Sequence, residues 1–427
     1  MSAATASLDE RTALRKAYGR LIPFLFILYV GAYLDRINVG FAALQMKQDL
    51  AFSDTVYGFG AGIFFLGYFI FEVPSNLILH RVGARRWIAR IMISWGVVSA
   101  CTALVTGPTS FYVVRFLLGV AEAGFFPGMI LYMTYWFPSA VRARVMSMFL
   151  VSVPISNVVG GPLSAALLGT SLFGLKGWQT MFVVEAIPAI VLGVVTAVWL
   201  TDRPAKAAWL TEPERTTLET LLEAERVATQ PKHTLRDGLV NPRVWLLAVV
   251  YFGLIMGFYG LPFWLPQIVR GFGGLSNLEV GLLSAVPYAV ASALMIVWGH
   301  RSDRRDERAW HVSLPLLAGA AGFLASGMTG DARVSLAALT LAAVGVYSAF
   351  GVFWTLPSAV LAGTAAAGGI ALINSVGNLG GYVGPVVVGR LRDSTGNYAA
   401  GLYVIAAAMG AAGLLVPLLR DRIPRRE

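Results

Sequence analysis

Apolar segments long enough to cross a lipid bilayer follow one another along the 427 residues of this chain. A membrane-spanning helix needs about 20 apolar residues, so roughly twelve helices fit with short connections. Because the bilayer core offers backbone groups no water, such segments predict an all-α integral membrane protein. We place the spans at residues 21–44, 57–79, 87–106, 110–134, 144–168, 178–200, 244–266, 279–299, 310–330, 334–357, 365–389 and 399–419.

Charge is scarce and unevenly placed. Charged residues make up 13% of the chain and hydrophobic residues 57%, whereas a soluble domain carries about 25% charged residues. The net charge of +10 could suggest a nucleic-acid partner. However, most lysines and arginines lie in the two tails, the central loop and alternate short loops. This positive-inside pattern predicts that both termini and the central loop are cytoplasmic, and it excludes a nucleic-acid partner.

The polar stretch from Thr201 to Arg243 divides the spans into two sets of six. We therefore predict an N-terminal bundle over residues 1–200, a cytoplasmic linker over 201–243 and a C-terminal bundle over 244–427. Thr211 and Glu214 have capping-box spacing, which predicts a short amphipathic helix in the linker. The basic loops HRVGARR (80–86) and GHRSDRRDER (299–308) lie at equivalent places and indicate an internal repeat, hence two pseudo-symmetric bundles. Loop residues expected to act in gating or structure are His80, Arg81, Asp303 and Arg304.

Two adjacent charges, Asp35 and Arg36, fall inside the first predicted span. A charge at this depth is costly unless it faces a partner or a water-filled cavity, so the pair indicates a functional site. The fourth span carries Arg115 and Glu122, which are seven residues apart and share a helix face. Helix rise places all four side chains at similar depths. Protonation of either acid would leave the cluster positive and attract an anion, so we predict that Asp35 and Glu122 couple proton binding to anion binding.

Tyr29, Tyr33 and Arg36 share one face of the first span, and a guanidinium can donate two parallel hydrogen bonds to a carboxylate. The second half has no ionisable residue in its spans apart from tyrosines, so it should read the rest of the substrate by shape and hydrogen bonding. We expect Glu72 to meet a basic loop residue as a gate, Glu185 to join helices, and Asn378 to serve packing. The predicted substrate-binding residues are Arg36, Tyr29, Tyr33, Arg115, Asn157, Tyr259, Trp354 and Asn374.

Several motifs together resemble the anion:cation symporter family of the major facilitator superfamily. They are YLDRINVG (33–40), YFIFEVPSNLILHRVGARRW (68–87), RFLLGVAEAGFFPG (115–128), GGPLS (160–164) and INSVGNLGGYVGP (373–385). The likeness is greatest to bacterial permeases for tartrate, phthalate, hydroxyphenylacetate and sugar acids. It implies twelve helices in two bundles, alternating access, and proton-driven uptake of a carboxylate across the bacterial inner membrane. By motif match, Asp35 and Glu122 resemble that family's proton-coupling acids, Arg36 its substrate arginine, and Arg115 its second basic position.

One departure from the superfamily pattern is His80, which replaces an aspartate in the loop after the second span, whereas Gly299, Asp303 and Arg304 keep the pattern after the eighth. The fifth span, with Asn157 as its main polar group, favours a less hydroxylated acid. Alternatives are an anion exchanger for organic phosphate or carboxylate, and an integral-membrane enzyme. An exchanger for organic phosphate would be expected to have an arginine in the seventh span, and this chain has none there. An integral-membrane enzyme would need a metal or catalytic site at depth, and this chain has no histidine in the middle of a span. We expect a monomer without cofactor or metal, driven by protons or sodium.

Overall fold

The structure, a computed structural model, describes residues 8–228, 240–360 and 363–422. These residues form helices and connecting turns, and twelve helical segments are long and apolar enough to cross a membrane, as predicted. The first half contains α1 (Leu8–Asp49), α2 (Asp54–Val82), α3 (Ala84–Cys101), η1 (Thr102–Leu104), α4 (Pro108–Glu122), α5 (Phe125–Thr134), α6 (Ser139–Leu150), α7 (Ser152–Leu168) and α8 (Gly177–Trp199).

A linker with η2 (Pro204–Lys206) and α9 (Glu212–Ala228) leads to the second half. That half contains α11 (Pro242–Arg270), α12 (Asn277–Arg305), α13 (Ala309–Met328), α14 (Ala332–Phe353), α15 (Thr355–Val360), α16 (Gly363–Thr395), α17 (Ala399–Leu415) and η3 (Val416–Arg422).

Several helices extend well beyond the predicted spans. For example, α1 begins at Leu8 and α16 continues to Thr395, whereas hydropathy predicted a start at 21 and an end at 389. The apolar pattern reports only the part of a helix that lies in hydrocarbon. Polar flanking residues continue the same hydrogen-bonded helix into the interface, where hydropathy no longer marks it.

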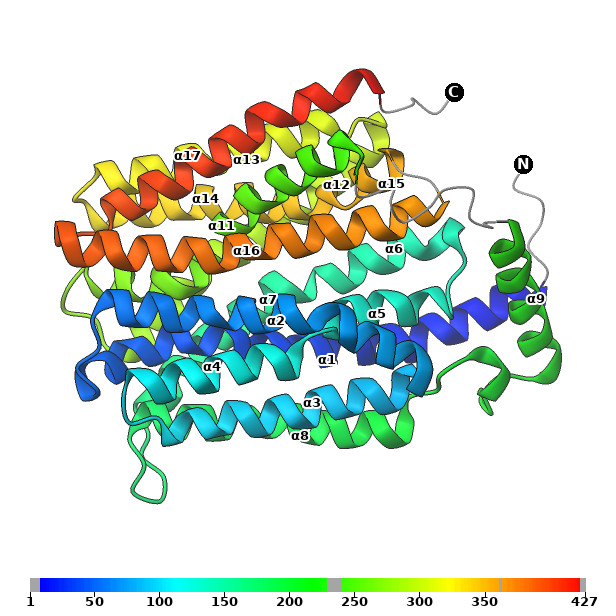
Figure 1. Ribbon diagram of the computed structural model, residues 1–427, viewed down its shortest axis with the longest axis horizontal. Coiled ribbons are helices and arrows are strands. Elements are labelled where there is room, and N and C mark those ends of the chain that lie inside the picture. The colour runs from blue at the N-terminus through cyan, green and yellow to red at the C-terminus, as the bar shows by residue number, and fades with distance from the viewer. Residues whose placement is uncertain (1–7, 229–239, 361–362, 423–427) are drawn as a thin grey trace.

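The two halves lie side by side with their long helices along one common direction (Figure 1). They meet along three helix pairs, α1 with α11, α2 with α16 and α7 with α12. One end of the molecule, the terminal end, carries the start of α1, the end of α17 and α9 (Figure 1). The other end, the loop end, carries the short connections that follow α1, α7 and α11. Each half therefore contributes three helices to one central interface.

At the loop end the halves approach to backbone contact. A Cβ added to Gly58 of α2 would lie 2.3 Å from the carbonyl oxygen of Pro385, and one added to Gly40 of α1 would lie 2.1 Å from that of Pro262. Real side chains cannot be accommodated at such distances, so only glycine allows this approach. The described interface is therefore closed at the loop end.

Polar contacts reinforce this closure. Asp393 of α16 accepts hydrogen bonds from the backbone N–H groups of Asp54 (3.0 Å) and Thr55 (2.7 Å), and so caps α2 from the opposite half. Lys47 pairs with Asp54 and also donates to Gln267 of α11 at 3.0 Å. The contacts of Asp393 with α2 and of Lys47 with Gln267 join the two halves and would have to break for the loop end to open.

Two spans are broken at corresponding places in the two halves. The fourth span changes from α4 to α5 directly after Glu122, where Gly124 adopts a left-handed conformation with φ of 84°. The tenth span changes from α14 to α15 at Trp354. Interrupted helices in equivalent positions of a repeat are typical of transporter binding sites, because they free polar groups at membrane depth.

The linker helix predicted from the capping box is α9, and it packs against the start of α1. Lys16 of α1 donates to both oxygens of Glu214, at 2.7 and 2.8 Å, and the backbone N–H of Thr211 donates to Glu214 at 2.8 Å. The Lys16 ammonium and this amide lower the pKa of the Glu214 carboxyl from its ordinary value. The helix is thus attached to the first half.

Candidate functional site

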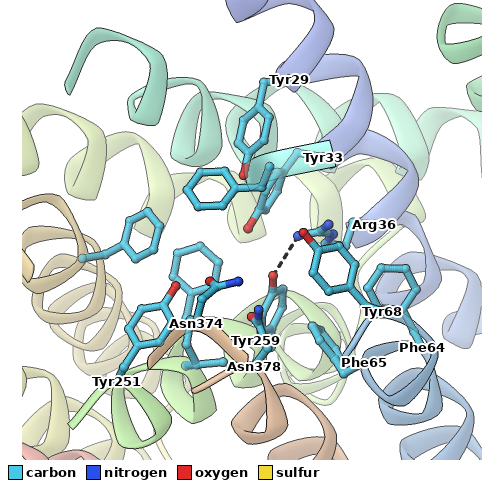
Figure 2. Close-up of a pocket in the computed structure, with 14 residues that line it drawn as sticks. Tyr29, Tyr33, Arg36, Phe64, Phe65, Tyr68, Tyr251, Tyr259, Asn374 and Asn378 are labelled. Carbon is cyan, nitrogen blue, oxygen red and sulfur yellow. Dashed lines mark hydrogen bonds between the residues drawn. The ribbon is translucent and has the colours of Figure 1, made fainter. Parts of the chain in front are cut away.

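A cavity lies between the two halves, where α1 and α2 face α11, α14 and α16 (Figure 2). The empty volume in and around this cavity is about 400 Å³. The wall is mostly aromatic, with one cationic side chain and two amides. Its lining residues are Tyr29, Tyr33, Arg36, Phe64, Phe65, Tyr68, Phe126, Tyr251, Ile255, Phe258, Tyr259, Phe350, Asn374 and Asn378.

Arg36 is the cation of this wall and links the two halves. Its Nη1 donates to the Tyr259 hydroxyl of α11 at 2.9 Å (Figure 2). Its Nη2 forms an ion pair with Glu122 at the break after α4. Its Nε has no hydrogen-bond partner. The guanidinium also lies 5.2 Å from the ring centre of Tyr33, within cation–π range. An incoming carboxylate would therefore compete with Glu122 for Arg36.

Asp35 points away from the cavity, although it is adjacent to Arg36 in sequence. Its two oxygens accept hydrogen bonds from Trp95 Nε1 (2.7 Å) and Ser99 Oγ (2.8 Å) of α3. It is only 1% exposed. The sequence grouped Asp35 with Arg36, Arg115 and Glu122 at one depth, but the structure brings together only Arg36 and Glu122 as a direct pair.

Glu72 and Asn374 meet across the interface between α2 and α16. The Asn374 amide donates to Glu72 Oε1, and Glu72 Oε2 has no partner. The expected basic loop partner of Glu72 is thus replaced by a neutral amide from the other half. Since Tyr68 and Asn378, one helical turn away on each helix, both line the cavity, this contact borders the site.

Three predicted substrate residues do not line this cavity. Arg115 is fully buried, donates weakly to Gly60 O (3.4 Å) and Ala61 O (3.5 Å), and leaves Nη1 unpartnered. Asn157 borders a separate small cavity and lies 3.4 Å from the Tyr347 hydroxyl. Trp354 packs edge-to-face against Tyr251 with ring centres 4.9 Å apart. Spacing in the sequence predicted how deep these residues lie in the membrane, but not the direction in which their side chains point.

The residues predicted to act in gating lie at the terminal end. His80 and Arg81 are exposed in the last turn of α2. Asp303 accepts from Arg308 at 2.5 Å, and Arg304 is exposed. In the first half, Asp202 accepts from the backbone N–H of Arg85 at 2.8 Å. A carboxylate from the linker therefore contacts the loop in which His80 replaces the superfamily's aspartate.

Asn378, predicted to serve packing, lies on the cavity wall, as Asn374 does. Sequence reasoning also missed several aromatic wall residues, including Phe65, Tyr251 and Phe258. Tyr251 and Tyr259 are at positions i and i+8, which share one broad face of a helix, and this spacing could have identified Tyr251. Among the described residues, no group of three or more His, Cys, Asp and Glu side chains could hold a metal ion.

Comparisons with known proteins agree with this architecture. Residues 25–385 match the model of the Major Facilitator Superfamily. A protein of Agrobacterium vitis named "Putative tartrate transporter" is 52% identical over 97% of this chain and 93% of its own length. The "Quinolone resistance transporter" of Acinetobacter baumannii is 44% identical over 98% and 97%.

The crystal structure of a bacterial homologue of the human lysosomal transporter Spinster superposes with a TM-score of 0.74 at 17% identity, covering 98% of each chain. That likeness supports the fold, and the family match supports the kind of protein. The chain therefore belongs to the Major Facilitator Superfamily and is a multi-pass membrane transporter, not an enzyme.

Proposed function

We propose that the chain is a proton-coupled symporter that takes up a small organic carboxylate by alternating access. The observation that carries the proposal is the Arg36–Glu122 ion pair at the cavity wall. Arg36 can bind a carboxylate through two parallel hydrogen bonds, but in this state Glu122 occupies part of that binding capacity. Relatives named as tartrate transporters support an organic acid as the substrate.

The coupling follows from competition for one guanidinium. When Glu122 takes up a proton, its charge is lost and Arg36 becomes available to the substrate anion. When the proton leaves, Glu122 again attracts Arg36 and displaces the anion. Proton binding and carboxylate binding thus favour each other, which is the requirement for symport. Asp35 is the second proposed proton-binding acid, held behind α1 by Trp95 and Ser99.

The closure of the loop end suggests the order in which the two ends open during this cycle. On the basis of the positive-inside rule, we propose that the terminal end, with its basic tails, faces the cytoplasm and that the protein lies in a bacterial inner membrane. The loop end then faces outward, and the described conformation is closed to the outside. Substrate and proton would enter after the loop end opens and leave through the terminal end. We propose that residues 1–200 and 244–427 move against each other as the two bundles.

The proposal can be tested with purified protein in lipid vesicles. In the unmodified chain, an inward proton gradient should drive accumulation of a transported acid such as tartrate. Asp35→Asn and Glu122→Gln should each abolish this accumulation, while at least one keeps counterflow exchange, which needs no net proton movement. Glu219→Gln, on the exposed face of α9, is the matched control. Accumulation by both Asp35→Asn and Glu122→Gln at the level of the unmodified chain would refute the coupling assignment.

A further inference from the structure

A second group of buried polar side chains lies within the first half, where α1 meets α3, α7 and α8. It contains Asp35, Asn38 and Glu185, none of which lines the cavity. All three are at least 98% buried, with exposures of 1%, 0% and 2%. Sequence reasoning assigned Glu185 only to helix contact, and the coupling scheme above does not use it.

Their hydrogen bonds are incomplete. Ser164 Oγ of α7 donates to Glu185 Oε1 at 2.7 Å, but Glu185 Oε2 has no partner. The Asn38 amide lies beside Glu185 but makes no hydrogen bond of good geometry. Asp35 and Asn38, one helical turn apart on α1, both lie near Glu185 of α8. A buried carboxylate oxygen without a well-formed hydrogen bond is costly as an anion, and uptake of a proton would remove that cost.

The charges around this group are unbalanced. Asp35 accepts from Ser99 and Trp95, and Glu185 accepts from Ser164. Among the described residues, no ion pair joins Asp35 or Glu185 to a cation. Arg36 is engaged with Glu122 and Tyr259. On α3, Arg90 stacks on Trp87, about two turns or more from Ser99.

Two carboxylates that are close together in a low-dielectric region cannot both remain ionised without a cation. We propose that Asp35, Asn38 and Glu185 form a proton-binding site behind the substrate cavity, with Glu185 as its second carboxylate. Asn38 can serve both states of this site, because its carbonyl accepts from a protonated carboxyl and its NH₂ donates to an ionised one. The inference rests on the proposed proton coupling and adds Glu185 and Asn38 to it.

The test measures substrate uptake into vesicles over a range of external pH for the unmodified chain and for Glu185→Gln. Removing the second carboxylate weakens proton binding at Asp35, so half-maximal uptake should require a more acidic medium, by about one pH unit or more, which is tenfold in proton concentration. Glu185→Met, an apolar replacement of similar size, provides a second variant if Gln prevents folding, since such replacements of buried charges are often tolerated.

Ser326→Ala is the matched control, because it removes a buried side-chain hydrogen bond, to Ser335 in the second half, but leaves both carboxylates and Ser164 in place. Its midpoint should stay within a few tenths of a pH unit of the unmodified chain. A merely structural role for Glu185 would lower uptake at every pH without moving the midpoint, and that result would overturn this site alone. If uptake by the unmodified chain does not depend on the proton gradient, the proposed function and the site are overturned together. Dependence on sodium instead of protons would also overturn the site.

Discussion

At the scale of single residues, Arg36 donates to Tyr259 of the other half, pairs with Glu122, the proposed proton-binding acid, and lines the cavity. The geometry of its side chain should therefore matter beyond its charge. Arg36→Lys keeps the charge but loses the planar fork that serves Glu122 and Tyr259 together. We expect substrate affinity to fall about ten- to a hundredfold, the equivalent of about 1.5–3 kcal/mol for a charge-assisted contact, measured by binding calorimetry. Unchanged affinity in a well-folded variant would show that the carboxylate binds elsewhere.

Asn374 and Trp354 provide a contrast within the second half. Asn374 lines the cavity, whereas Trp354 does not line it and packs edge-to-face against Tyr251. We expect Asn374→Ala to change the order in which aromatic, dicarboxylic and sugar acids compete for uptake. Trp354→Ala should leave that order unchanged and lower all rates together. A change of order in Trp354→Ala would instead place the indole in contact with substrate during the cycle.

At the scale of elements, the attachment of α9 to α1 depends on one ion pair. Because Lys16 lowers the pKa of Glu214, this pair stabilises the attachment above the ordinary glutamate value of 4.5, and the stabilisation is lost as the pH falls below it. Glu214→Gln should remove the pH dependence. We expect faster amide hydrogen exchange in α9 of this variant at pH 7, with Glu219→Gln unchanged. Equal exchange rates in Glu214→Gln and the unmodified chain would show that apolar contacts alone hold α9.

Sequence patterns predicted the elements better than their contacts. Hydropathy located all twelve spans, and the capping box located α9, because both signals are local. The direction of a buried polar side chain depends on helix rotation, which adjacent charges do not reveal. Asp35 and Arg36 are neighbours in sequence, yet one bonds to Trp95 and the other to Glu122. The contact of Glu72 with Asn374 joins residues 302 positions apart, so it depends on the packing of the two halves.

At the scale of the whole molecule, close glycine contacts stabilise the closed loop end. Gly58→Leu would place a side chain against the carbonyl of Pro385. We expect this variant to favour the state that is open at the loop end, because only separation of α2 from α16 relieves the overlap. Spin labels at Ser171 and Asn397, exposed on the two halves, should report a longer distance by double electron–electron resonance. The single native cysteine, Cys101, is replaced by serine for this measurement.

The matched control is Gly19→Leu in α1, where no atom lies within 4 Å of the added Cβ. Its label distance should equal that of the parent chain. If Gly58→Leu also keeps the parent distance while remaining folded, the overlap is relieved by local adjustment, and the glycine contact does not determine which end is closed.

The cap that Asp393 provides for α2 has a further consequence. The first amides of this helix find their acceptors in the other half only while the loop end is shut. Opening therefore leaves two N–H groups to water and costs about 0.5–2 kcal/mol, the usual loss on removing a helix cap. Ser53 still accepts from Val56, so the start of α2 keeps its own cap while the amides of Asp54 and Thr55 become hydrated in each turnover. An isotope label at Thr55 would register this change of solvation, far from any bound substrate.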